Sequence, residues 1–339
     1  MKQIDLKDKK ILYQLDRDSS QTNKQIARKV KLSEMTTSNK IKRLISLNIV
    51  DNFYVKTNPS YLGYTHIKVY LRLHNITKAK ETEIINHLKK QKAIFWLSTL
   101  RGKYDIVLSI YVKSIFEFSQ KYHELFLKYQ EFILDRNVIV LESASSFTKA
   151  YLLPRQESEE IIYSEGESLH EHSKSHQKRV GARVGKTQTK IDKKDEELLK
   201  ILSKNARESF VNIATKLKAS ADTVKYRIKN LEKKGIITGF STKINFNKLN
   251  NSYHLIFLKL HNMTSQKFSK MKTFTKTNKN IVVYIKTIGD HEVELEVETS
   301  NKEELDKLIK DLRDNFSNEI KDYDLLEVTE EHLLNYYNF

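Results

Sequence analysis

Apolar positions recur at helical spacing at the start of the chain. Asp5 and Asp8 can begin a helix whose apolar positions are Leu6, Ile11, Leu12 and Leu15. A second short helix is expected over 23–30, and a third over 33–47 with Ser33 as its N-cap. Alternation typical of a strand follows over 49–56. This region therefore predicts three helices and a β-hairpin, which together make a winged helix-turn-helix.

The next hundred residues follow a different pattern. Strands are expected near 66–74, 95–100, 104–112 and 137–143, and helices near 80–91 and 115–128. The order strand, helix, strand, strand, helix, strand is that of a ferredoxin-like βαββαβ domain. The two patterns together predict an α+β protein.

The whole pattern then repeats after 187 residues. Ile4, Asp5 and Asp8 correspond to Ile191, Asp192 and Asp195, and the same shift without a gap aligns the run 73–75 with 260–262. Such a long period is typical of duplicated domains with their own cores rather than of a solenoid. In the second copy, Ser220 is the expected N-cap of the third helix, and strands are expected near 253–261, 281–288, 291–299 and 325–329.

Five segments follow from the repeat. They are a winged helix-turn-helix over 1–60, a ferredoxin-like sensor and dimerisation domain over 61–154, a charged linker over 155–189, a second winged helix-turn-helix over 190–249 and a second ferredoxin-like domain over 250–339. The linker has acidic and then basic blocks without apolar periodicity, which favours solvation. Its histidines, His170, His172 and His176, lack the carboxylate or thiolate framework of a metal site.

Composition narrows the function classes. The chain has no cysteine, which excludes disulfides, thiolate metal sites and a cysteine nucleophile, and suits a reducing interior. No apolar h-region or long apolar run occurs, so a cytoplasmic, nucleoid-associated protein without membrane contact is expected. No Ser/His/Asp spacing, phosphate loop or metal motif is present. We therefore expect no enzyme, no cofactor and no metal.

The net charge of +17 is unevenly distributed. Residues 1–60 contain 13 basic and 6 acidic residues, a net +7, and residues 190–249 contain 15 and 7, a net +8. Residues 250–339, by contrast, carry a net −4. A uniform lysine bias would charge every segment alike, whereas basic winged domains are typical of proteins that bind double-stranded DNA.

The third helix of each copy is the candidate DNA-reading element, because a helix fits the major groove. Its polar residues lie opposite the expected buried stripe, although a solvated helix face would show them too. The expected DNA-binding residues are Ser33, Thr36, Ser38, Asn39, Lys40, Lys42, Arg43 and Lys56 in the first copy, and Ser220, Thr223, Lys225, Tyr226, Arg227, Lys229, Asn230 and Lys243 in the second. Lys56 and Lys243 are placed at wing edges.

Several runs resemble the leucine-responsive and asparagine-operon (Lrp/AsnC, feast/famine) transcription regulators. They include residues 5–12, 25–27 and 36–44, and in the second copy 213–214, 223–224, 227–232 and 234–237. The resemblance implies that the winged domains bind DNA and that the ferredoxin-like domains dimerise and sense small molecules, usually amino acids. Unlike most such regulators, this chain fuses two copies, and Thr37 and Asn48 replace Val224 and Gly235 of the second copy.

The resemblance also implies an effector loop with a glycine followed by a Tyr-Asp pair. Gly102, Tyr104 and Asp105 match this pattern, whereas the second copy keeps only Gly289 and continues with His291 and Glu292. The expected ligand-binding residues are Gly102, Tyr104, Asp105 and Gly289, for an amino-acid effector. Tight turns alone would also explain both glycines.

Strand alternation predicts how the sensor domains meet. Glutamates at 292, 294, 296 and 298 share one face of a second-copy strand, and Lys68 and Arg72 share a face of a first-copy strand. Pairing unlike copies avoids like-charge repulsion, so we expect an intrachain pseudo-dimer, which would in turn form a homo-oligomer.

The favoured function is a sequence-specific Lrp/AsnC-type regulator with two unlike DNA-reading heads. The alternative is a nucleoid or chromatin-like architectural DNA-binding protein. A third hypothesis is an enzyme similar to fused siroheme decarboxylases, which share this architecture. The glutamate-rich strand argues against it, because that strand would repel an anionic tetrapyrrole.

Overall fold

The computed structural model describes residues 4–154, 157, 189–335 and 337. Nearly all of the expected linker, with His170, His172 and His176, lies outside these residues. The first copy consists of α1 (Leu6–Arg17), α2 (Asn23–Val30), α3 (Glu34–Ser46), β1 (Val50–Thr57), η1 (Pro59–Leu62), β2 (Thr65–Leu73), α4 (Lys78–Lys89), β3 (Ile94–Arg101), β4 (Ile106–Val112), α5 (Ile115–Phe126), η2 (Leu127–Phe132), β5 (Ile133–Ser146) and η3 (Ala150–Leu152).

The second copy repeats the order of the first. It consists of α8 (Lys193–Lys204), α9 (Phe210–Leu217), α10 (Ala221–Lys233), β6 (Ile237–Ile244), η5 (Phe246–Leu249), β7 (Ser252–Leu260), α11 (Ser265–Thr277), β8 (Ile281–Ile288), β9 (Val293–Thr299), α12 (Lys302–Phe316) and β10 (Ile320–Leu334). The predicted duplicated α+β fold is confirmed. We call α1–α3 head one and α8–α10 head two.

Local sequence starts the first helix of each head. Asp5 and Asp8 form a capping box at α1, and Asp192 and Asp195 form the same box at α8. In each box the two carboxylates accept from backbone N–H groups that the first turn would leave unpaired. The apolar faces of the three helices then close a separate core in each head.

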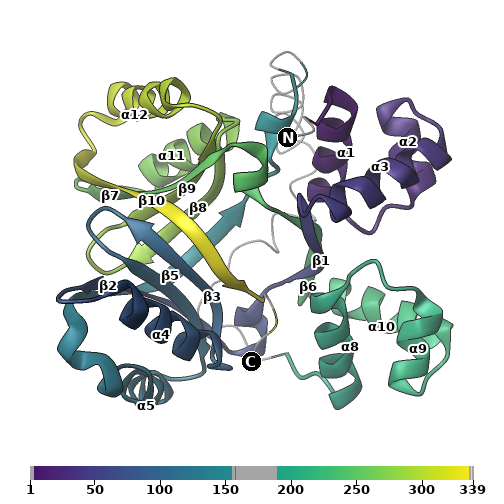
Figure 1. The fold of residues 1–339 in the computed structure, drawn as a ribbon, viewed down its shortest axis with the longest axis horizontal. Coiled ribbons are helices and arrows are strands. Elements are labelled where there is room, and N and C mark those ends of the chain that lie inside the picture. Colours follow the sequence, from purple (N-terminus) through teal and green to yellow (C-terminus); the bar gives the residue numbers. More distant parts are fainter. Residues whose placement is uncertain (1–3, 155–156, 158–188, 336, 338–339) are drawn as a thin grey trace.

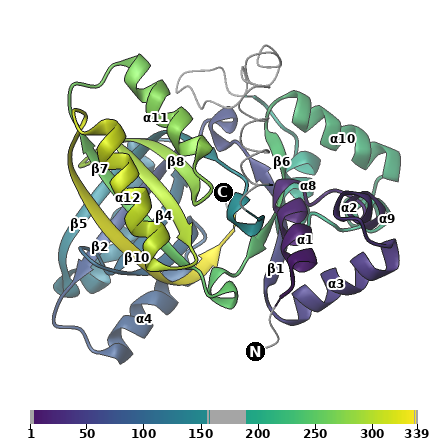
Figure 2. The same cartoon turned by 90° about the horizontal axis from the view of Figure 1, so that it is seen from above.

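The predicted wing hairpins are not formed. Each copy contributes a single strand, and β1 pairs with β6 in an antiparallel two-stranded ribbon that joins the copies. The expectation was wrong because alternation identifies a strand but not its partner. The ribbon lies between the heads and the remaining strands (Figures 1 and 2).

The other eight strands form one closed sheet in the order β10-β3-β4-β2-β5-β8-β9-β7. Within it each copy keeps ferredoxin-like neighbours, and α4 and α5 cover one side while α11 and α12 cover the other (Figure 1). Val69 and Leu295 are among the aliphatic side chains that face these helices, as their alternation predicted.

Two strands are longer than expected, because each pairs with both copies. The first part of β5 pairs with β2 and its end with β8, and the first part of β10 pairs with β7 and its end with β3. These two seams close the sheet and join the copies by backbone hydrogen bonds. Pairing of the two sensor domains within one chain is therefore a feature of the fold.

A buried ion-pair cluster lies between the two halves of the sheet. Lys68 Nζ lies 2.5 Å from Glu294 Oε1 and 3.0 Å from Glu296 Oε1, and Tyr70 donates to Glu294 at 2.7 Å. Burial by itself raises the pKa of Glu294, but Lys68 and His291 outweigh it and hold the pKa at about 2. The expected contact of Lys68 is confirmed, whereas that of Arg72 was wrong, because Arg72 is exposed near the strand end.

Among the described residues, no helix is long and apolar enough to cross a bilayer. Both heads lie on the same side of the molecule, with the closed sheet opposite them (Figures 1 and 2). This arrangement places both recognition helices together on one side.

Candidate nucleic-acid interface

The recognition helices α3 and α10 are fixed by a buried stripe. Thr37, Ile41 and Leu44 face the core of head one, and Val224, Ile228 and Leu231 face that of head two. The opposite side of each helix forms an exposed ridge at spacings i, i+4, i+7 and i+11. We call these the outer ridges: Met35, Asn39, Lys42 and Ser46 in head one, and Asp222, Tyr226, Lys229 and Lys233 in head two.

The N-caps of both recognition helices are as predicted. Ser33 accepts from the Thr36 N–H at 3.0 Å, and Ser220 accepts from the Thr223 N–H at 3.1 Å. The two hydroxyls of each pair are also within 2.8 Å of one another. These contacts close the first turn of each recognition helix.

Head one accommodates Thr37 and Asn48, which stand where head two has Val224 and Gly235. Thr37 is fully buried, and its hydroxyl donates to the Ser33 carbonyl at 2.9 Å, so the polar atom is satisfied. Asn48 adopts a φ of +54°, in the left-handed region where Gly235 has +75°. Asparagine tolerates this conformation better than other residues with a side chain. Head one therefore keeps the backbone course of head two.

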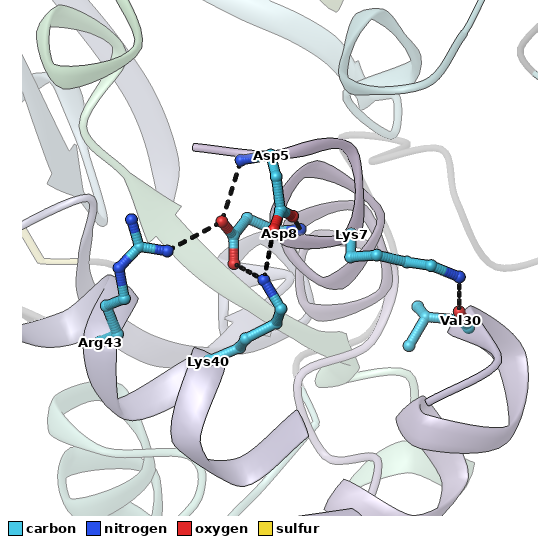
Figure 3. A network of polar contacts seen from close by, with 6 residues as sticks. All are labelled: Asp5, Lys7, Asp8, Val30, Lys40 and Arg43. Atoms are coloured by element: carbon cyan, nitrogen blue, oxygen red, sulfur yellow. Dashed lines mark hydrogen bonds and ion pairs between the residues drawn. The ribbon is translucent and has the colours of Figure 1, made fainter. Parts of the chain in front are cut away.

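Lys40 and Arg43 do not lie free on α3. Lys40 Nζ lies 2.6 Å from Asp5 Oδ2 and 3.0 Å from Asp8 Oδ1, and Arg43 lies 3.1 Å from Asp8 Oδ2 (Figure 3). Burial by itself raises the pKa of Asp5, but the hydrogen bonds from Lys40 and from the Asp8 N–H outweigh it and lower the pKa. Both cations thus anchor α3 to the capping box of α1.

Head two uses the same anchor with a different cation. Arg227, at the position equivalent to Lys40, lies 2.8 Å from Asp192 Oδ2 and 2.6 Å from Asp195 Oδ1. Lys40, Arg43 and Arg227, which were expected at the DNA, are paired here with carboxylates 32 or 35 residues earlier in the chain, and their contact with DNA stays a prediction. The recurrence in both copies indicates that this anchor sets the angle of the recognition helix.

The remaining predicted residues divide by exposure. Asn39, Lys42, Lys225, Tyr226 and Lys229 are exposed, although Lys225 also lies 3.2 Å from Asp222. Ser38 and Asn230 are half-buried. The exposed residues lie on or beside the outer ridges.

The ribbon lysines are not at wing edges. Lys243 lies 2.7 Å from Glu331 of β10 and 3.7 Å from Asp51. Lys56 is opposite Gly239 in the β1–β6 ribbon and is half-buried. Their expected placement was wrong for the same reason as the hairpins, since the strands that carry them pair with each other.

Matching contacts tie each head to the ribbon strand of the other copy. The Ser19 N–H donates to the Phe240 carbonyl at 3.3 Å, and the equivalent Ala206 N–H donates to the Phe53 carbonyl at 2.9 Å. Arg207 also donates to the Ser19 carbonyl at 3.1 Å and to Asn23 at 2.7 Å. Sequence analysis missed Arg207, because its role depends on the neighbouring copy. The two heads are thus linked directly through Arg207 and indirectly through the ribbon.

The contacts of the expected effector residues Asp105 and Tyr104 are with residues of their own copy. Asp105 accepts from the Leu73 N–H at 2.7 Å, and Glu292 accepts from the equivalent Leu260 N–H at 2.6 Å, so the two carboxylates have one structural role. Tyr104 is buried, with its ring centroid 5.6 Å from that of Tyr70.

The two glycines pack against the opposite copy. A Cβ on Gly102 would lie 3.1 Å from the Leu325 carbonyl oxygen of β10, and one on Gly289 would lie 2.5 Å from Ile139 Cδ1 of β5. Both glycines also have positive φ, +134° and +154°. Close approach between the copies therefore explains why glycine occupies both positions.

Comparison with known proteins starts from the heads. A winged helix-turn-helix DNA-binding family model matches residues 4–51 and 191–238, one match in each copy. The transcriptional regulator LrpA of Pyrococcus horikoshii is 51% identical over 59 residues, which are 17% of this chain and 42% of that relative.

A longer match decides the family. LrpA of Pyrococcus abyssi is 33% identical over 119 residues, which are 35% of this chain and 83% of that regulator. The chain belongs to the Lrp/AsnC-type transcriptional regulators. This Lrp/AsnC-type regulator differs from the relatives named here in carrying the unit twice, as both family-model matches show.

One solved structure matches the whole regulator. The siroheme decarboxylase NirDL covers 98% of this chain, and 96% of its own chain is covered, at 12% identity and a TM-score of 0.61. The expectation that this chain is no enzyme is overturned, because the same tandem architecture serves an enzyme. The glutamate argument also fails, since Lys68 and Tyr70 pair with Glu294 inside the sheet.

Proposed function

We propose that this regulator binds specific double-stranded DNA through α3 and α10, and that each head contacts a different half-site. The observation that supports this most is the composition of the outer ridges. Asn39 is at the centre of one ridge and Tyr226 is at the centre of the other, and both are exposed on equivalent backbone positions. Asparagine can pair with adenine in the major groove, whereas tyrosine cannot make that bidentate contact.

The charge of the heads supports a shared phosphate contact. Lys42 and the equivalent Lys229 are both exposed on the outer ridges. Equivalent cations on unlike ridges suit contacts that position both heads on the backbone while other side chains select the bases.

The test is a comparison of selected and scrambled duplexes over a range of salt concentrations. A regulator of this kind binds its selected site at least about a thousandfold more tightly than scrambled DNA, and the selected site is asymmetric. Near-equal affinity for both duplexes would instead support the alternative, an architectural nucleoid protein. A symmetric palindrome would contradict two unlike half-sites.

An effector remains part of the proposal. Gly102, Tyr104, Asp105 and Gly289 lie where the copies meet, so an amino acid bound near them would act on the contact between sensor domains. Tyr104 and Asp105 already have partners within the first copy, Tyr70 and the Leu73 N–H, so such a ligand would have to displace these contacts. Calorimetric titration with each amino acid tests whether an effector binds.

We also propose that whole chains assemble into a homo-oligomer. Light scattering, which measures the mass of the assembly, tests this.

A second candidate rests on the whole-chain match. NirDL has also been solved in complex with an iron-uroporphyrin III analogue. If this chain bound a similar ring, titration with iron-uroporphyrin III would give a saturable change in the absorption of the tetrapyrrole. No saturable change would remove this candidate and leave DNA binding unaffected.

A further inference from the structure

Head two exposes three large apolar side chains, two in the first turn of α9 and one on the outer ridge of α10, which we call together the apolar patch. Phe210 and Val211 occupy the first turn of α9 and are 42% and 67% exposed, and Tyr226 on the outer ridge is 69% exposed. The Nζ of Lys225, the residue before Tyr226, lies 5.8 Å from the Phe210 ring. The start of α9 therefore lies beside the exposed part of α10.

The fold does not require this patch. Head one has Asn23, Lys24 and Asn39 at the three equivalent positions, with the same N-capped helix at α2. The core of head two is closed by other residues of α9, Ile213, Ala214 and Leu217, which are buried. Exposed apolar groups that packing does not need are typical of a contact surface.

The position of the patch identifies what it can contact. In a helix-turn-helix the recognition helix enters the major groove and the preceding helix crosses the backbone beside it. The main apolar feature on base edges in that groove is the C5-methyl group of thymine. Lys24 of head one can contact a phosphate, whereas Val211 cannot, so head two has exchanged charge for apolar surface at this edge.

We propose that Tyr226, together with Phe210 at the neighbouring start of α9, contacts thymine methyl groups and gives head two a preference for thymine that head one lacks. This inference rests on the proposed function, because it specifies what one of the two heads selects. Each methyl group buried against the patch contributes about fourfold in affinity, the factor expected for burial of one CH₂-sized group. Asn39 gives head one no such contact.

The first experiment identifies the half-site of each head. The chain contains no cysteine, so a cysteine introduced by mutation is the only one present. An iron chelate attached to it cleaves nearby DNA. Arg28→Cys and Thr215→Cys are equivalent exposed positions on α2 and α9. Each labelled protein is bound to the selected duplex, and the two cleavage positions separate the half-sites.

The second experiment removes the methyl groups. Deoxyuridine replaces thymidine at one position at a time in each half-site, which keeps base pairing and deletes only the C5-methyl group. Binding is measured for the wild type and for Tyr226→Asn and Phe210→Asn, which introduce the residues of head one. Asn39→Ala serves as the matched variant of the other ridge.

The expected result is a loss of about fourfold in wild-type affinity at one or more positions of the head-two half-site. That loss disappears in Tyr226→Asn, shrinks in Phe210→Asn and persists in Asn39→Ala. An equal loss in the wild type and in Tyr226→Asn, or no loss at any head-two position, overturns the inference while DNA binding stands. Failure to bind any duplex selectively overturns the proposed function itself.

Discussion

At the residue scale, Lys68 joins the two copies through a buried ion pair. It is 2% exposed and is the partner of both Glu294 and Glu296. Burial by itself lowers the pKa of Lys68, but these two carboxylates outweigh it and raise the pKa. Its charge is therefore held deep inside the closed sheet.

We predict that Lys68→Met lowers the free energy of unfolding by about 3–5 kcal/mol, because it leaves a buried carboxylate uncompensated. Unfolding in urea is followed by the fluorescence of Trp96, the only tryptophan. Adding Glu294→Gln should recover part of the loss. Lys259→Met, which removes a half-exposed partner of Asp290, should cost under about 1 kcal/mol; equal losses would contradict the prediction.

His66 makes the stability depend on pH. Its Nε2 is buried without a hydrogen-bond partner in the described part of the chain. Burial lowers the pKa of His66 from 6.5 to about 3, with Lys68 adding to the effect and Glu294 opposing it. The unfolded imidazole therefore binds a proton at a higher pH than the folded one.

The free energy of unfolding should fall as the pH is lowered from about 6.5 toward 3, because only the unfolded state takes up the proton in that range. The expected slope from this group is about 1.4 kcal/mol per pH unit. His66→Phe keeps the ring contacts with Phe95 and Tyr111 and should remove this part of the slope. Denaturant titrations at several pH values measure it, and an unchanged slope would sink the assignment.

At the scale of elements, the contact of Arg227 on α10 with Asp192 and Asp195 at the start of α8 is expected to position the recognition helix, while the outer ridge contacts the DNA. We predict that Arg227→Ala destabilises head two by roughly 1–2 kcal/mol, since it breaks the charged hydrogen bonds to Asp192 and Asp195 in a partly exposed site. It should weaken binding to every duplex by a similar factor. Lys229→Ala, on the outer ridge, should instead flatten the salt dependence by about one unit. Selection from a random library with each variant is the check, and a changed base preference in Arg227→Ala would refute the anchor role.

The contact between Gly289 and β5 provides a test of the seam between the copies. Gly239 has a φ of +153°, almost that of Gly289, but a Cβ there would meet nothing within 4 Å. Both alanine variants carry backbone strain, and only Gly289→Ala also pushes against Ile139. It should therefore cost about 1–3 kcal/mol more than Gly239→Ala. Thermal unfolding compares them, and equal costs would show that the close approach does not matter.

At the scale of the whole molecule, the two copies form one closed sheet through two seams. If a protease site is introduced between residues 158 and 188 and cleaved, the halves should remain a one-to-one complex, because β5–β8 and β10–β3 stay paired. The complex should persist in about 1 M salt, since buried ion pairs are screened little. Size-exclusion chromatography with light scattering measures it. Separation of the halves on cleavage would show that the seams do not hold them.

The sequence by itself determined the features that depend on near neighbours. The helices of both heads follow from apolar spacing and from caps such as Ser33 and Ser220, because these interactions join residues three or four apart. The ferredoxin-like order followed from alternation in the same way. Duplication was equally visible, since it needs only a comparison of the chain with itself.

Tertiary structure decided which distant groups meet. Alternation could not predict that β1 would pair with β6 rather than form a hairpin, or that β5 and β10 would each pair with both copies. The spacing of polar residues along the third helix could not show that Asp5 binds Lys40 or that Asp192 binds Arg227. A strand edge and a charged side chain can each take many partners, and only the packed molecule brings one of them within hydrogen-bond distance.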